Sequence, residues 1–140
     1  MAESEGSARL HVMLVSPEEI LYEGDAEMVI LRADDGDIAF LPGHVPFLGA
    51  LGIGAVRVIS PDGEVAAAVH GGFVEVSNDR VIVLSDLAEL PDQIDVARAH
   101  AAKERAERAL AADADDEEAA DALARAELRI QIGEGTPVST

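Results

Sequence analysis

Residues 36–49 read Gly-Asp-Ile-Ala-Phe-Leu-Pro-Gly-His-Val-Pro-Phe-Leu-Gly, which predicts two short strands joined by a tight turn. Pro42 fixes φ at about −65° and Gly43 readily adopts a positive φ, which is the combination that a type II turn requires. Because His44 follows this turn, we expect it to lie together with the acidic run 34–37 near one end of a β unit.

A period of two in the apolar residues continues through Pro91. Short β-rich runs alternate with turn-forming groups such as Pro61-Asp62-Gly63 and Asn78-Asp79, and both groups suit hairpin connections. No helical pattern interrupts these runs. Eight to ten short strands at such spacing predict an antiparallel β-sandwich or barrel over residues 1–91.

After Pro91 the period changes to 3.6 residues and the composition changes to alanine. Asp92 is the expected N-cap of a helix over 93–112, with Asp95 adding negative charge to its first turn. A polar break at 113–116 precedes a second helix, over 117–131, that ends at Gly133. So short a link predicts an antiparallel two-helix hairpin within residues 92–140.

The hairpin is rich in alanine, with 14 between positions 97 and 126. A methyl group buries little apolar area, so an alanine interface is weak, whereas the high helix propensity of alanine keeps each helix intact when it is undocked. The composition is compatible with a hairpin that detaches and extends, and equally with a static hairpin packed on the β domain.

The net charge of −18 argues against binding to nucleic acid and against direct adsorption to anionic lipid. Residues 1–91 contain 16 acids and four bases, whereas residues 92–140 contain 12 acids and six bases, so the cations concentrate on the hairpin. The absence of cysteine fits a reducing cytoplasm. No apolar run is long enough to span a membrane.

The residues give no support for catalysis. The four histidines, His11, His44, His70 and His100, have no metal-ligand spacing, and there is neither a phosphate loop nor a nucleophile elbow. We therefore expect a protein that is not an enzyme, binds no metal and requires no cofactor.

The stretch that ends at Pro46 contains an acidic-Gly-acidic group, a short apolar run and the motif Pro-Gly-His-x-Pro. This order resembles the signature of the epsilon subunit of F-type ATP synthases, which is called delta in mitochondria. The resemblance extends in the same order over residues 8–130. It includes the first strand and its exit turn, an aromatic-x-Gly group, a Gly-Gly-Phe strand and the opening of the first C-terminal helix, at 10–18, 22–24, 71–76 and 94–99.

This resemblance implies a β-sandwich of about ten short strands, followed by the helical hairpin, and a non-catalytic rotor subunit of the central stalk. Asp37 and His44 would contact the c-ring, and a neighbouring face of the sandwich would hold the gamma subunit. The extended hairpin would meet the catalytic beta and alpha subunits and limit ATP hydrolysis, through the cations Arg98, Lys103, Arg105 and Arg108. The chain would lie peripherally at the cytoplasmic face of the bacterial inner membrane, attached only through the complex.

The group Ile94-Asp95-x-x-Arg98-Ala99 resembles a motif with which some bacterial epsilon subunits bind ATP, so ATP is a candidate weak regulatory ligand. Arg98 and Arg105 share one helix face, and Arg125 and Arg129 could converge on them from the second helix, which would suit a triphosphate. In the alternative interpretation, Asp95 caps the helix, and Arg98, Arg105 and Arg129 pair with Asp95, Glu104 and Glu127. A nucleotide sensor without a rotor role and a static rotor spacer are the rival functions.

Overall fold

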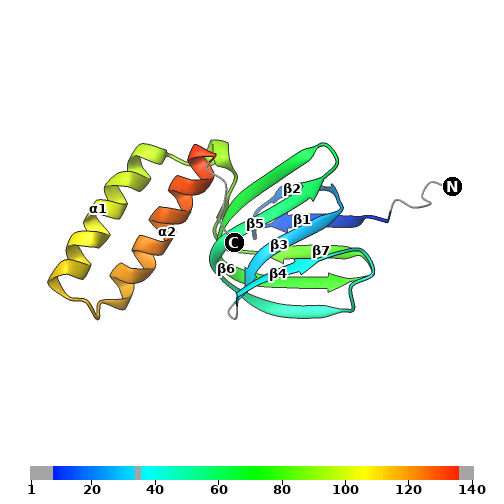
Figure 1. Cartoon of the computed structure of the whole chain (residues 1–140), viewed down its shortest axis with the longest axis horizontal. Coiled ribbons are helices and arrows are strands. Elements are labelled where there is room, and N and C mark those ends of the chain that lie inside the picture. The colour runs from blue at the N-terminus through cyan, green and yellow to red at the C-terminus, as the bar shows by residue number, and fades with distance from the viewer. Residues whose placement is uncertain (1–7, 34–35, 136–140) are drawn as a thin grey trace.

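The computed structural model describes residues 8–33 and 36–135, which form a β-sandwich with a helical hairpin on one side (Figure 1). The strands are β1 Leu10–Val15, β2 Ile20–Ala26, β3 Met28–Ala33, β4 Gly36–Phe40, β5 Phe47–Ser60, β6 Gly63–Ser77, β7 Arg80–Leu84 and β8 Ala88–Glu89. They pair in the order β2-β1-β7-β6-β5-β3-β4, with β8 on β6.

The predicted β-sandwich followed by a helical hairpin is confirmed, and the structure differs from the prediction in detail. The described residues form eight strands, because β5 and β6 are 14 and 15 residues long and each takes the place of two shorter strands. The pair β1–β7 is parallel. Only strands joined by a tight turn must be antiparallel, and β1 and β7 are far apart in sequence.

The long strand β6 contains a pair of adjacent glycines with positive φ. Gly71 and Gly72 have φ values of 89° and 135°. A Cβ atom on Gly72 would lie 2.1 Å from the carbonyl oxygen of Leu84, so only glycine fits at this point. The Gly-Gly pair therefore lets β6 bend close to β7.

The core lies between the two layers and consists almost entirely of aliphatic side chains. Phe40 is its one large aromatic residue, completely buried. The other members alternate along the strands with exposed residues, as the period of two predicts. They include Leu10, Val12, Leu14, Val29, Leu31, Val56, Val58, Val69, Val74, Val76, Val81 and Val83. Because no helix residue belongs to this cluster, the sandwich has a core of its own.

The predicted turns are present. Gly43 has φ 86°, and its amide donates a hydrogen bond of 2.7 Å to Asp79. Asn78 and Asp79 both have positive φ, 53° and 61°, as a two-residue hairpin turn of type I′ requires. The bond from Gly43 to Asp79 joins the turn before β5 to the turn before β7.

The helices are α1 Val96–Ala112 and α2 Glu117–Glu134, preceded by a short 3₁₀ turn, η1, at Pro91–Gln93. The prediction of Asp92 as N-cap is wrong: Ile94 is extended, which prevents an earlier start, and Asp95 caps α1 by accepting from the amide of Arg98. Asp116 caps α2 in the same way.

The second helix does not end at Gly133 as predicted. It continues to Glu134, and Gly135 in the left-handed conformation ends it. A Cβ atom on Gly133 would lie 2.7 Å from the Cγ2 atom of Val96, so this glycine permits close packing of α2 against the start of α1.

Helix α2 docks on β5 and β6 of the sandwich, and α1 lies on the outer side of α2 (Figure 1). The buried residues of α1 are Ala99 and Ala106, which together with alanines of α2 allow the close approach of the two helices. In contrast, Leu128 and Ile132 of α2 pack on Ala68 of β6. The alanine interface that the sequence predicts therefore lies within the hairpin, whereas the docking contact uses larger side chains.

Candidate functional site

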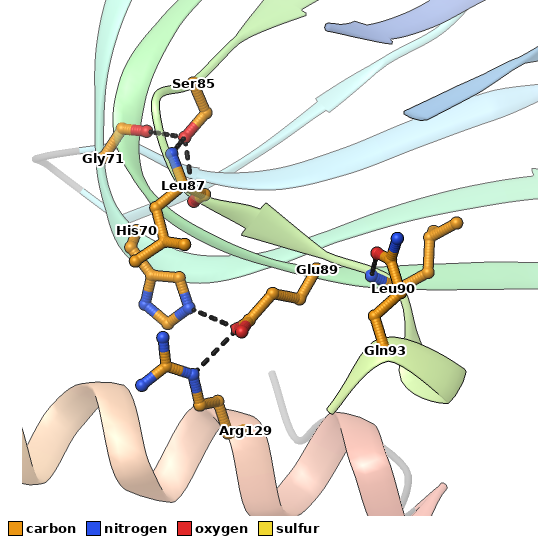
Figure 2. A network of polar contacts seen from close by, with 8 residues as sticks. All are labelled: His70, Gly71, Ser85, Leu87, Glu89, Leu90, Gln93 and Arg129. Atoms are coloured by element: carbon orange, nitrogen blue, oxygen red, sulfur yellow. Dashed lines mark hydrogen bonds and ion pairs between the residues drawn. The ribbon is translucent and has the colours of Figure 1, made fainter. Parts of the chain in front are cut away.

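The junction between the sandwich and α2 contains a chain of three polar side chains (Figure 2). His70 lies on β6, Glu89 on β8 and Arg129 on α2. The Oε1 atom of Glu89 is 3.0 Å from Nε2 of His70 and 2.8 Å from Nε of Arg129. The carboxylate thus connects the β domain to the hairpin.

The segment that carries Glu89 is held by hydrogen bonds on both sides of it (Figure 2). The buried hydroxyl of Ser85 donates to the carbonyl oxygen of Gly71 at 2.6 Å. Further along, Gln93 accepts from the amide of Leu90 at 2.8 Å. These bonds fix the direction in which Glu89 points.

Burial and charge act on the titratable groups of this junction. Burial lowers the pKa of His70, Glu89 acts against this shift, and the positive charges of Arg129 and Arg125 reinforce it. Burial alone would raise the pKa of Glu89, but the hydrogen bonds from Arg129 and His70 lower it. The docked junction therefore favours a neutral His70 and an ionised Glu89.

Most of the predicted ATP-binding residues line one pocket, of about 310 Å³, beside this junction. Five of the seven predicted residues are present, Asp95, Arg98, Ala99, Arg105 and Arg129, together with Glu89, Gln93 and Ala102. Three of the four arginines that the triphosphate hypothesis brings together therefore line one hollow, and they come from two helices.

The two remaining candidates lie elsewhere. Ile94 packs on the apolar cluster around Leu128. Arg125 does not line the pocket but acts electrostatically on His70. In the described part of the chain Arg129 pairs with Glu89, so its predicted pairing with Glu127 is wrong, because β8 brings a carboxylate closer.

Asp37 and His44 do not lie together, contrary to our expectation. Asp37 is at the start of β4, where it pairs with Arg32 at 2.7 Å and lines a pocket shared with Lys103 of α1. His44 follows the other end of β4, where its ring lies edge-on to Phe40. The rest of β4 and the turn after it separate the two residues, and Asp34 and Asp35 lie outside the described residues.

The four cations predicted to contact the catalytic head all lie on α1. Three are exposed and Lys103 is partly buried. Within residues 8–33 and 36–135, none of Arg98, Lys103, Arg105 and Arg108 has a carboxylate within ion-pair distance. The structure therefore presents the three arginines to solvent on the outer helix of the hairpin.

An exposed apolar face on the sandwich was not identified from the sequence. Phe73 of β6 lies opposite Leu84 of β7 on one side and Ala50 of β5 on the other, and Leu48 is two residues from Ala50. Leu48, Phe73 and Leu84 are 73%, 57% and 49% exposed. The sequence pattern could have revealed this face, because Leu48, Phe73 and Leu84 each occupy an outward position of an alternating strand, where a polar residue is usual.

In the regions that the structure describes, no helix is long and apolar enough to cross a membrane. The same regions bring no three metal-binding side chains together.

A sandwich with an exposed apolar face, joined to a hairpin that docks on it through a few side chains, has the features of a protein-binding module. The chain belongs to the delta/epsilon chain family of ATP synthases: residues 9–91 match the family model described as ATP synthase, Delta/Epsilon chain, beta-sandwich domain. Membership confirms the resemblance deduced from the Pro-Gly-His motif and the prediction of a non-catalytic subunit.

Individual relatives extend the similarity into the hairpin. The ATP synthase epsilon chain of Streptomyces griseus is 44% identical over 126 residues, which cover 89% of this chain and 95% of that one. The epsilon chain of Anoxybacillus flavithermus is 50% identical over 103 residues, 74% of this chain and 77% of that one.

Among solved structures, a chain in the Euglena gracilis mitochondrial ATP synthase (OSCP/F1/c-ring) superimposes with a TM-score of 0.68 at 22% identity, over 91% of this chain and 78% of that one. A chain in the Tetrahymena thermophila mitochondrial ATP synthase central stalk and c-ring gives 0.50 at 13% identity, over 60% and 68%. At these identities the likeness concerns the fold alone.

Proposed function

We propose that this chain is the epsilon subunit of a bacterial F-type ATP synthase, in which it forms part of the central rotor and couples the gamma subunit to the c-ring. The family match and the near full-length similarity to a bacterial epsilon chain support this role. The Tetrahymena chain with the same fold is described as part of a central stalk and c-ring. The chain would lie at the cytoplasmic face of the inner membrane, held there by the complex.

The observation that carries the rotor role is the exposed face of Leu48, Phe73 and Leu84. Large exposed apolar patches on a folded domain indicate protein–protein contacts. We assign this face to the gamma subunit, because the core of the sandwich is already complete without it.

The test of this role is binding of the full chain to purified gamma subunit, measured by calorimetry. Changing Phe73→Asp or Leu84→Asp buries a charge in the contact, and we expect affinity to fall at least about a hundredfold, as for the central residues of an interface. Ala120→Asp, at an exposed position of α2, is the matched control and should bind normally. Unchanged affinity in both sandwich variants would refute the assignment.

Contact with the c-ring remains a proposal for Asp37 and His44, and the structure makes it more specific. Asp37 lies at the start of β4 and His44 lies beyond its other end, so we expect a single c-ring loop to contact one of the two residues. Cross-linking from each position separately decides which end of β4 faces the ring. We expect efficient cross-linking from one position, and no cross-link from either would exclude this loop region as the contact.

The hairpin is proposed to restrain ATP hydrolysis by extending towards the catalytic beta and alpha subunits. The exposed cations of α1 support this role, since they can meet acidic surfaces once α2 leaves the sandwich. Deleting 92–140 from the assembled enzyme should raise ATP hydrolysis and leave synthesis largely intact. A cross-link that locks α2 on β5 should have the same effect on hydrolysis. No change in either variant would favour a static spacer.

ATP is proposed as a weak regulatory ligand of the folded hairpin, because Arg98, Arg105 and Arg129 line one pocket. Binding should be weaker than micromolar and should be lost in Arg98→Ala and Arg105→Ala. Arg125→Ala, which alters a cation outside the pocket, is the control. Equal binding by all four proteins, measured by calorimetry, would exclude this pocket.

A further inference from the structure

The junction in Figure 2 contains an unpaired buried atom. The side chain of His70 is only 2% exposed, and within the described part of the chain its Nδ1 atom is buried with no hydrogen-bond partner. Buried polar atoms are nearly always paired, so this exception needs an explanation.

The hydrogen bond to Glu89 decides which nitrogen of His70 carries hydrogen. A carboxylate can only accept, so the Nε2 atom donates to it and the Nδ1 atom holds a lone pair. A proton added to the ring must therefore go to Nδ1. Docking would then bury an N–H group that has no acceptor, on a ring that has become positively charged.

The charged groups that face His70 come from two elements. Glu89 on β8 favours protonation, whereas Arg125 and Arg129 on α2 oppose it. Ile53 lies opposite His70 on β5 and is apolar. When α2 leaves, both arginines move away and the ring meets water, while Glu89 stays beside it. The proton is therefore easier to add in the undocked state.

We propose that His70, Glu89 and Arg129 form an acid-sensitive latch, which holds α2 on the sandwich when the ring of His70 is neutral and releases α2 when the ring is protonated. The latch is a property of the isolated chain, so its failure would leave the proposed role in ATP synthase untouched.

The direction of the pH dependence follows from linkage. Docking lowers the pKa of His70 below its ordinary value of 6.5. Docking is therefore strongest above that pH and weakens as the pH falls towards the pKa of the docked state. For each unit by which the pKa of His70 differs between the docked and the undocked state, the equilibrium constant for docking falls about tenfold at most. Docking also lowers the pKa of Glu89, so protonation of Glu89 at more acidic pH weakens docking further.

The first test is an NMR titration of the histidine rings in the full chain. The pKa of His70 should lie below 6.5 and below that of His11, whose pKa is raised by hydrogen bonds to Glu23 and Asp25. In the double variant Leu128→Asp/Ile132→Asp, which undocks α2, the pKa of His70 should return to 6.5 or above. The titration of His11 in that variant shows whether the sandwich is still folded. Equal pKa values for His70 in both proteins would overturn the latch.

The second test measures docking itself, by pulsed electron resonance between spin labels at the exposed positions Asp62 and Ala114. A Leu128→Ala background weakens docking, so that the open state becomes visible between pH 8 and pH 5.5. The open fraction should rise on acidification, and His70→Gln, which can still donate to Glu89 but cannot titrate, should abolish this rise. His100→Gln is the matched control, because His100 pairs with Glu134 inside the hairpin. The proposal would be overturned if the open fraction still rises on acidification in His70→Gln. It would equally be overturned if the open fraction does not rise in the Leu128→Ala protein that retains His70.

Discussion

Replacing Leu128 with alanine should release the hairpin and leave the sandwich folded. Leu128 is 7% exposed, and its buried neighbours are Ala68 and Ile132. Removing a buried leucine side chain costs about 2–5 kcal/mol, and the lower part of this range applies to a small cluster at the edge of a domain. We expect docking to weaken by about 2–3 kcal/mol, which is about 30- to 150-fold in the equilibrium constant.

The assay uses the absence of cysteine from the chain. Ala68→Cys places a single thiol beneath α2, at a position with no solvent exposure, so the rate of its labelling reports the opening of the hairpin. Adding Leu128→Ala should increase this rate about 30- to 150-fold, in proportion to the opening constant. Glu127→Ala, at the exposed neighbouring position of α2, is the control for helix propensity and should change the rate little.

A second thiol distinguishes undocking from unfolding. Val74→Cys lies in the core of the sandwich and is labelled only when that domain opens. Its rate should not respond to Leu128→Ala. If both thiols are labelled faster by the same factor, the hairpin and the sandwich unfold as one unit, and the reasoning that separates their cores is wrong.

Two further predictions concern the sandwich. Residues 1–91 alone should give a β-rich circular dichroism spectrum and a cooperative unfolding transition, because the main core contains no helix residue; a disordered spectrum would show that the hairpin is needed. Gly72→Ala should lower the free energy of unfolding by more than about 2 kcal/mol beyond Gly63→Ala, as measured by urea denaturation. Both glycines have φ 135°, but only at Gly72 would the new Cβ atom meet a backbone oxygen. Equal losses would refute the steric argument.

The class of fold could be predicted because its signals are local. The period of two, the Asn78-Asp79 turn and the change to alanine after Pro91 each depend on neighbouring residues. The helix start was misplaced by three residues for a local reason as well: Asp92 and Asp95 are both good caps, and only the extended backbone of Ile94 selects the second.

The junction could not be predicted, since its residues meet only through tertiary structure. His70 and Glu89 are 19 residues apart, and Arg129 follows 40 residues later. The separation of Asp37 from His44 was missed for a related reason. The two residues are close in sequence, but the extended strand from Asp37 to Phe40, which spans about 10 Å, and the turn at 41–43 lie between them.

One set of side chains packs α1 against α2, and a different set packs α2 against the sandwich. Small residues such as Ala99, Ala106 and Ala126 line the contact between α1 and α2, whereas Leu128 and Ile132 make the contact with the sandwich. A change at Leu128 therefore alters docking without removing the packing within the hairpin. Undocking exposes only a small apolar cluster and one ion pair, so α1 and α2 can leave the sandwich together as a folded unit. Modest differential binding energy from another surface can shift such an equilibrium. In the proposed latch, one proton on His70 would have the same effect.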